Sequence, residues 1–307
     1  MNILILGGTG FIGSKILKKI QVKFKVENLS LSEGFDLRKE NIIKNFIKKK
    51  KFHTIINCAA HVGGLGYIKE RKAEIISDNI KIYLNLYSSL KNLKKKPNII
   101  NLISNCVYPG KLKLQSESKV FDGQIHDSVE PFGLAKLVLL KLAKFFYDQY
   151  SIKTLNLILP NAYGPGDHVD TRRSHALNGI IVRMINRQRK KEKYFEIWGS
   201  GKPKREWIYA DDVSKLIFMI LNDKNIFKNC ENLNVAQNKS YSINYIAKKV
   251  KKILNYNCKL YNNLKFPDGA SMKQLDNKIF NKKFKNFIFT DFSKGLKKTI
   301  NFYKNTI

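Results

Sequence analysis

The sequence predicts an α/β fold of the Rossmann type, a doubly wound parallel sheet with a smaller C-terminal substrate-binding region. Three observations support this prediction. The chain opens on a short apolar run, ILIL, followed at once by the glycine-rich and amphipathic stretch GGTGFIGSKILKKI. Further β-type runs then alternate with helical patterns, which predicts right-handed βαβ units. From residue 165 onward glycine and proline interrupt the alternation, which indicates a second region over the carboxyl edge of the sheet.

The expected elements follow in chain order. Short runs rich in Ile, Leu and Val, bounded by polar or turn residues, predict buried strands. After the opening run, such strands are expected at 54–60, 98–104, 154–159 and 232–236. Helical periodicity predicts helices between them at about 38–50, 69–92 and 132–149.

The same pattern divides the chain into two regions. We expect a dinucleotide-binding domain over 1–164, to which residues 206–236 return. The irregular segments 165–205 and 237–307 are expected to form the substrate-binding region. Folds of this class bind ligands at the carboxyl ends of the strands, so the site should lie between the two regions.

Composition narrows the class of protein. Of the 307 residues 43% are hydrophobic. No apolar run reaches the roughly 18 residues that a membrane-spanning helix needs. The opening residues carry neither a basic segment nor a small-residue cleavage site, so we expect no signal peptide and a cytoplasmic protein. The four cysteines are scattered without metal-ligand spacing, which favours reduced thiols and no metal site.

The net charge of +33 comes from 57 basic and 24 acidic residues. Only eight of the basic residues are arginine, and the lysines are spread nearly evenly along the chain. Nucleic-acid binding would need a basic stripe with interleaved aromatic side chains, which this spacing does not supply. We therefore expect a solvated lysine surface that steers an anionic substrate, with no nucleic-acid or membrane partner.

The first turn predicts a dinucleotide site. Gly7, Gly10 and Gly13 form G-x-x-G-x-x-G directly after a predicted strand and before a predicted helix. Glycines there allow a tight turn, close approach of the backbone to a pyrophosphate, and close packing of the helix on the strand. The free amides and partial positive charge of the helix N-terminus add to the attraction for phosphates.

The residues that would distinguish NAD from NADP are less decisive. An acidic residue after the second strand would hold a ribose 2′-hydroxyl, whereas a nearby arginine would suit a 2′-phosphate. The sequence offers Ser30 and Ser32 there, with Arg38 and Lys39 as the nearest cations. Both cofactors therefore stay open, and the basic surface favours NADP(H) over NAD(H).

Longer motifs extend over most of the chain. They are AAHVGGLG (59–66), SNCVYP (104–109), EPFGLAK (130–136), PNAYGPGD (160–167), SHALNGIIVRM (174–184), WGSGKPKREWIYADD (198–212) and FPDGASMKQLD (266–276). In this order and spacing the chain resembles the extended short-chain dehydrogenase/reductases. Within them it is most similar to the GDP-L-fucose synthases, bifunctional epimerase–reductases that act on GDP-4-keto-6-deoxymannose.

The resemblance implies roles for the catalytic residues. Ser104 corresponds to the serine that polarises the C4 carbonyl, and Lys136 to the lysine that holds the nicotinamide ribose. Cys106 and His175 correspond to the acid/base pair that epimerises C3 and C5, where the 4-keto group acidifies the adjacent C–H bonds. A lone cysteine is more often a small buried hydrophobe, and a lone histidine a satisfied surface residue. Their roles therefore rest on the surrounding motifs.

The resemblance also implies contacts to both ligands. Arg183, Trp198, Arg205 and Asp268 correspond to nucleotide-sugar contacts. Arginine suits a diphosphate because its planar guanidinium binds oxyanions in pairs. The implied cofactor contacts are Gly7, Gly10, Phe11, Ile12, Gly13, Leu102, Asn105, Lys136, Leu159, Asn161, Ala162 and His175.

Phe132 departs from the family pattern, which has at this position the tyrosine that protonates the C4 oxygen. The change removes one hydroxyl, so folding and binding should survive, while general acid catalysis worth about 10²–10⁴-fold is lost. Two explanations compete. One is an engineered Tyr→Phe exchange, which the otherwise intact catalytic positions favour. The other is a natural homologue that has shed or rerouted the reduction.

Two further departures concern the cofactor. Thr9, Ser30 and Ser32 stand where the family has arginines that reach the adenosine 2′-phosphate, which weakens the preference for NADP. Asn105 follows Ser104 in the loop that faces the nicotinamide, with no consequence that the sequence defines.

Together these features predict a homodimeric nucleotide-sugar 4-ketoreductase, with or without 3,5-epimerase activity, that acts on a GDP-4-keto-deoxysugar or a GDP-4-keto-heptose. Phe132 is expected to impair the reduction. The predicted helix at 132–149 has a continuous apolar run and is the candidate for a four-helix-bundle dimer interface. Two alternatives remain: a sugar-nucleotide epimerase with tightly bound NAD, and a non-catalytic homologue that binds nucleotide sugars.

Overall fold

The structure is a computed structural model that describes residues 1–170, 173–223, 225–266 and 268–307. Its centre is a six-stranded sheet in the order β10-β6-β4-β3-β1-β2, in which every pairing is parallel. The strands are β1 (Asn2–Leu6), β2 (Lys25–Leu29), β3 (Thr54–Asn57), β4 (Asn98–Ser104), β6 (Thr154–Leu159) and β10 (Cys230–Asn234). The strand order reverses at β1, so the switch point at which such sheets bind ligands lies between β1 and β3.

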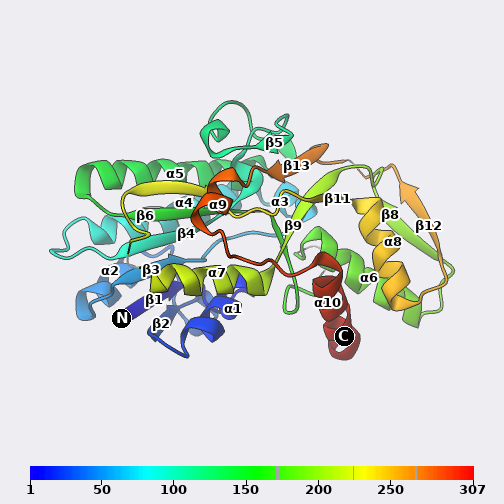
Figure 1. Cartoon of the computed structure of the whole chain (residues 1–307), viewed down its shortest axis with the longest axis horizontal. Coiled ribbons are helices and arrows are strands. Elements are labelled where there is room, and N and C mark those ends of the chain that lie inside the picture. Colours follow the sequence, from blue (N-terminus) through cyan, green and yellow to red (C-terminus); the bar gives the residue numbers. More distant parts are fainter. Residues whose placement is uncertain (171–172, 224, 267) are drawn as a thin grey trace.

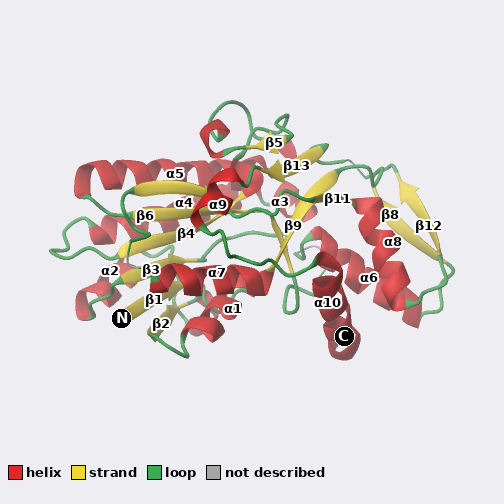
Figure 2. Ribbon diagram, viewed as in Figure 1, coloured by secondary structure: helices red, strands yellow, loops and turns green. Residues whose placement is uncertain are grey.

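Helices cover both faces of this sheet (Figures 1 and 2). One face carries α2 (Glu40–Lys49), α4 (Lys72–Leu90) and α5 (Glu130–Tyr150), and the other carries α1 (Phe11–Ile20) and α7 (Ala210–Asn222). Alternate residues of β1 enter different cores: Leu4 and Leu6 pack under α4 and α5, whereas Ile3 and Ile5 pack under α1 and α7. A strand buried on both faces must be apolar throughout, which explains the run ILIL.

A smaller region lies beside one end of the large sheet (Figure 1). Its strands are β5 (Leu114–Gln115), β7 (Asn161–Tyr163), β8 (Tyr194–Trp198), β9 (Lys204–Tyr209), β11 (Ser240–Ser242), β12 (Lys259–Asn263) and β13 (Met272–Leu275). They form the path β11-β9-β13-β5, with β7 pairing β9, and the separate pair β12-β8. The remaining helices are α3 (Leu65–Glu70), α6 (Ala176–Arg189), α8 (Ile243–Leu254), α9 (Lys278–Lys283) and α10 (Phe292–Thr306). Of these, α6, α8 and α10 share one apolar core with β8 and β9.

The predicted α/β class with a doubly wound parallel sheet is confirmed. The strand expected at 54–60 ends at Asn57, because its neighbour β1 turns away at Gly7. The helix expected at 69–92 is broken at Arg71, whose φ of −126° and ψ of 41° are not helical, so α3 and α4 are separate. Within the described ranges, no helix is long and apolar enough to cross a membrane.

Candidate active site

The glycine-rich turn joins β1 to α1 at the switch point of the sheet. Gly7 has a φ of +80°, and a Cβ on it would lie 2.8 Å from the Cα of Ala59. A Cβ on Gly13 would overlap the carbonyl oxygen of Gly7, so glycine alone lets α1 pack this closely. Gly10 is the N-cap of α1, and no described side chain caps this end. The first amides of α1 are therefore free for an oxyanion, as the pyrophosphate of a dinucleotide requires.

We expect Gly13→Ala to lower dinucleotide affinity by at least about tenfold and the free energy of unfolding by about 1–3 kcal/mol. The added methyl group pushes α1, with its free amides, away from Gly7. Fluorescence titration with NADPH and thermal unfolding measure the two effects. Gly66→Ala is the matched control, because nothing lies within 4 Å of a Cβ there. Equal losses in both variants would contradict the packing argument.

The loop after β2 presents neutral polar groups. The amide of Gly8 donates to Oδ1 of Asn28 at 2.8 Å, and the amide of Thr9 donates to Oγ of Ser30 at 3.2 Å. The hydroxyls of Thr9 and Ser32 lie 2.7 Å apart. Ser30 and Ser32, at the position predicted to face the cofactor ribose, thus brace the glycine-rich turn.

The nearest predicted cation is already engaged. Arg38 forms salt bridges to Asp36 at 2.8 Å and to Asp78 at 2.9 Å. These hydrogen bonds raise the pKa of Arg38 further above its usual value. Lys39 is the N-cap residue of α2. A 2′-phosphate would therefore have to compete with two carboxylates for Arg38.

Lys136 lies on the second turn of α5 and is buried near the end of β4. Its Nζ donates to the carbonyl of Leu102 at 2.9 Å and lies 5.0 Å from the centre of the Tyr83 ring. Burial lowers the pKa of Lys136 to about 7, because an ammonium group loses its hydration there. Burial also raises the pKa of Cys58 to about 12, so this neighbour is a neutral thiol. The amine keeps donors for a ligand hydroxyl.

Phe132 precedes Lys136 by one turn and is only 6% exposed. The Nζ of Lys136 lies 5.7 Å from the centre of its ring. Tyr67 and Cys106 pack against the same small apolar cluster as Phe132. The other buried members of that cluster are Ile68, Ile75, Ile125 and Val129.

Ser104 ends β4 and holds the following turn. Its Oγ accepts the amide of Cys106 at 3.2 Å. Nζ of Lys273, a residue only 6% exposed, donates to Sγ of Cys106 at 3.8 Å. Burial lowers the pKa of Arg205, an effect that negative charge on Cys106 and Asp268 opposes. Cationic groups near the sulfur suit a thiolate that exchanges protons with a substrate.

The next strand end completes the predicted nicotinamide contacts. Ser104 pairs with Leu159 in the sheet, and Leu159 and Ala162 are buried. Nδ2 of Asn161 donates to the carbonyl of Glu206 at 3.3 Å. Asn105 is buried, and its Nδ2 has no partner among the described residues.

A different set of contacts holds His175, the N-cap residue of α6. Its amide and its Nδ1 both lie 3.1 Å from Oδ2 of buried Asp167, which also accepts Nδ2 of Asn178 at 2.6 Å. Burial raises the pKa of Asp167, but the charge of His175 and the hydrogen bonds from His175 and Asn178 together outweigh it, so the net pKa is lowered. A carboxylate only accepts, so Nδ1 carries the proton and Nε2 is left for a ligand. Phe11, which opens α1 ahead of Ile12, lies 6.2 Å from His175 between ring centres.

The predicted substrate residues form two groups. The guanidinium carbon of Arg183 lies 4.0 Å from the centre of a Trp198 ring, and that tryptophan stacks on Phe266 at 5.0 Å. Burial lowers the pKa of Arg183 to about 10. Asp268 accepts the amide of Ser200 at 2.9 Å and its hydroxyl at 2.6 Å. Trp198 and Phe266 are 44% and 40% exposed, so part of this aromatic pair faces solvent.

Sequence reasoning did not single out Asp167, Lys273, Phe266 or Tyr67. The first three lie in quoted motifs, but only the fold brings them to His175, Cys106 and Trp198. For Asp167, an acid just ahead of a candidate histidine was a usable signal. Among the described residues, no group of three acidic, cysteine or histidine side chains could hold a metal ion.

Comparison with known proteins connects this geometry to a family. Residues 3–236 match the model of the NAD dependent epimerase/dehydratase family. The chain is 28% identical to the GDP-L-colitose synthase of Yersinia pseudotuberculosis over 309 aligned residues, which cover 99% of this chain and 98% of that protein.

Two solved structures extend the comparison. The GDP-L-fucose synthetase of Naegleria fowleri superimposes with a TM-score of 0.84 at 25% identity, covering 99% of this chain and 94% of the other, and it has also been solved bound to NADP. A GDP-6-OMe-4-keto-L-xylo-heptose reductase from C. jejuni shares the fold with a TM-score of 0.87 at 22% identity, covering 100% and 98%. With the family model matching most of the chain, this protein is an enzyme of the NAD dependent epimerase/dehydratase family.

Proposed function

We propose that this protein is a cytoplasmic, NAD(P)-dependent 4-ketoreductase of a GDP-linked 4-keto-deoxysugar or 4-keto-heptose, with or without 3,5-epimerisation at the same site. The relatives named above are synthases or reductases of GDP-linked sugars. The free cysteines agree with a reducing compartment.

One observation supports the proposal most directly. The buried amine of Lys136 is held on the Leu102 carbonyl at 2.9 Å, at the strand end that leads to Ser104. The glycine-rich turn lies after β1 on the same sheet, so a dinucleotide lying along its edge would place its second ribose at Lys136. A reduced nicotinamide bound there would supply the hydride for C4.

The chain's own residues would then handle the substrate. The hydroxyl of Ser104 orients the C4 carbonyl, and Lys136 holds the ribose of the cofactor. Cys106 and His175 move protons at C3 and C5, with Asp167 fixing the imidazole. Phe132 has no proton to donate to O4, so reduction is impaired relative to a tyrosine at the same place.

The nucleotide half of the substrate would be bound by the smaller region. Trp198 and Phe266 stack at an interplanar angle of 19° and offer an aromatic face to guanine. Arg183 and Arg205 supply guanidinium groups for the diphosphate. Asp268, close to Arg205, belongs to the same wall of the proposed pocket.

NADP(H) is the proposed cofactor, with NAD(H) as the second choice. The Naegleria fowleri structure with bound NADP supports this preference. The neutral hydroxyls of Ser30 and Ser32 at the glycine-rich turn and the engaged Arg38 oppose a strong preference. Comparing the oxidation rates of NADPH and NADH in the incubation described next measures this preference.

A single incubation in deuterium oxide tests the function. The protein is mixed with GDP-4-keto-6-deoxymannose and NADPH; NADPH oxidation is followed by fluorescence and deuterium at C3 and C5 by mass spectrometry. We expect slow oxidation together with deuterium incorporation, and Cys106→Ser should reduce the incorporation by about 10²-fold or more. Cys230→Ser is the matched control. Oxidation without deuterium would show a reductase that does not epimerise. The absence of both oxidation and deuterium incorporation would refute the proposal.

A homodimer through α4 and α5 is part of the proposal. The two helices pack against each other on one face of the sheet. Leu84 on α4 and Leu134 and Phe145 on α5 are 42%, 39% and 59% exposed, respectively. A second copy meeting these helices would bury these side chains in a four-helix bundle.

A further inference from the structure

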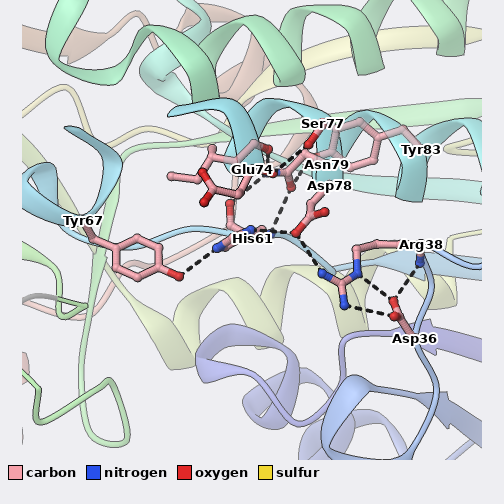
Figure 3. Close-up of polar contacts among 10 residues, drawn as sticks. Asp36, Arg38, His61, Tyr67, Glu74, Ser77, Asp78, Asn79 and Tyr83 are labelled. Carbon is pink, nitrogen blue, oxygen red and sulfur yellow. Dashed lines mark hydrogen bonds and ion pairs between the residues drawn. The ribbon is translucent and has the colours of Figure 1, made fainter. Parts of the chain in front are cut away.

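A continuous chain of polar contacts leads away from Tyr67 (Figure 3). The Tyr67 hydroxyl lies 2.8 Å from Nε2 of His61, and Nδ1 of His61 lies 3.0 Å from Oδ2 of Asp78. Arg38 donates to that same Asp78 oxygen at 2.9 Å and is itself held by Asp36. These residues come from the segments after β2 and β3 and from α3 and α4, so only the fold brings them together.

The near end of this chain lies at the candidate active site. Tyr67 packs against the same apolar cluster as Phe132 and Cys106. Its ring packs closely on Gly63, where an added Cβ would come within 2.5 Å of a ring carbon. The guanidinium carbon of Arg173, two residues before the candidate base His175, lies 5.9 Å from the ring centre. The phenol is therefore among the groups expected around the sugar.

The Asp78 end of this series of contacts determines which ring nitrogen of His61 carries a proton. Asp78 accepts hydrogen bonds from Arg38 and His61, so Nδ1 of His61 carries a proton. The backbone of His61 is fixed as well, since its amide donates to Oδ1 of Asn79 at 3.0 Å and its carbonyl accepts Nδ2 of Asn79 at 2.8 Å. A histidine held between a carboxylate and a hydroxyl is the arrangement through which protein sites pass protons.

We infer that Tyr67 is the acid that protonates the C4 oxygen in this chain, with His61 and Asp78 as a positioning and proton-supplying pair behind it. The inference rests on the proposed 4-ketoreductase function. It assigns the protonation of O4, which Phe132 cannot perform, to Tyr67 on α3. A protein with a second proton donor for O4 fits a natural homologue that has rerouted the reduction better than it fits an engineered Tyr→Phe exchange.

Atoms and electrons balance in this step. The C4 carbon accepts the hydride and its carbonyl π pair moves to O4, which takes the proton of the Tyr67 hydroxyl. The phenolate left behind takes a proton from Nε2 of His61 in its imidazolium form. Asp78 accepts the hydrogen bond from Nδ1 of His61 throughout, and a hydronium ion or a buffer acid from solvent returns the proton to Nε2.

Four chains test the inference: the protein, Tyr67→Phe, Phe132→Tyr and the double variant. NADPH oxidation is followed in a single turnover with GDP-4-keto-6-deoxymannose, in water and in deuterium oxide. We expect Tyr67→Phe to lower the reduction rate by about 10²-fold in the native background and by less than about threefold once Phe132→Tyr supplies a donor. Tyr194→Phe, at a tyrosine that is 59% exposed, is the matched control.

The outcomes separate the two hypotheses. Equal losses from Tyr67→Phe in both backgrounds, or no loss in either, would overturn the relay and leave the ketoreductase proposal standing. Hydride transfer in none of the four chains would refute the proposed function and, with it, the inference.

His61→Gln supplies a readout that a structural role would not move. It should raise the solvent isotope effect on reduction while leaving the KM for the GDP-sugar within about twofold, because it slows proton supply to Tyr67 alone. An unchanged isotope effect together with a raised KM would make His61 a binding residue and contradict the relay.

Discussion

Phe132→Tyr should raise the rate of C4 reduction by about tenfold. A positioned general acid contributes about 10²–10⁴-fold, and we infer that Tyr67 already recovers part of this in the native chain. The new hydroxyl would stand one turn before Lys136, whose buried amine has a pKa of about 7 and can stabilise a phenolate beside it. The exchange adds one oxygen to a ring at 6% exposure and leaves the apolar cluster in place.

Single-turnover oxidation of NADPH with GDP-4-keto-6-deoxymannose measures this effect. Phe121→Tyr is the matched control, since Phe121 is 44% exposed and belongs to no part of the proposed site. The affinity for NADPH should be equal in the native chain and in both variants. An unchanged rate in Phe132→Tyr would show that residue 132 is not where O4 is protonated, while a rate increase in the control would point to a general effect on folding.

Lys136→Met should abolish most of the reductase activity and stabilise the folded protein. Methionine keeps the apolar stem but removes the amine that lies on the Leu102 carbonyl at 2.9 Å. Without that amine the cofactor ribose loses its anchor, so we expect NADPH affinity to fall by about 10-fold or more and reduction by about 10²–10⁴-fold. Stability should rise because a buried amine with a depressed pKa has an ammonium form that is costly to bury.

The pH dependence follows from the sign of this shift. The pKa of Lys136 falls from its ordinary 10.5 to about 7 on folding, so between these values the unfolded chain binds more protons and stability rises with pH. The stability cost of Lys136 is therefore full below about pH 7 and vanishes above about pH 10.5. The gain in melting temperature of Lys136→Met should be larger at about pH 6.5 than at about pH 10. A gain that grows with pH would show that the lysine is not buried as an amine.

The sequence predicted the parts of the fold that local patterns specify. ILIL and the glycine spacing identified β1, the phosphate-binding turn and α1, because a strand buried on both faces and a helix packed on glycine tolerate few other residues. The helix break at Arg71 was not predicted, since apolar periodicity runs through it, and α3 ahead of the break contacts η4 (Asp127–Val129).

The candidate site divides in the same way. Ser104, Cys106, Lys136 and His175 could be proposed from motifs, because each stands beside turn and strand residues of recognisable spacing. Their partners could not be identified. Lys273 reaches Cys106 across 167 residues of chain, and no local pattern links them.

By itself the sequence determined the class of the fold, the glycine-rich turn after β1 and the family, and it predicted a missing catalytic hydroxyl at Phe132. The tertiary structure alone decided that Arg38 is bound by two carboxylates, that Asp167 holds His175, and that Tyr67, hydrogen-bonded to His61, packs against the same apolar cluster as Phe132. The physical reason is that hydrogen bonds and charge pairs act over about 3 Å in space. Strand order and helix packing set those separations between segments that are remote in the chain.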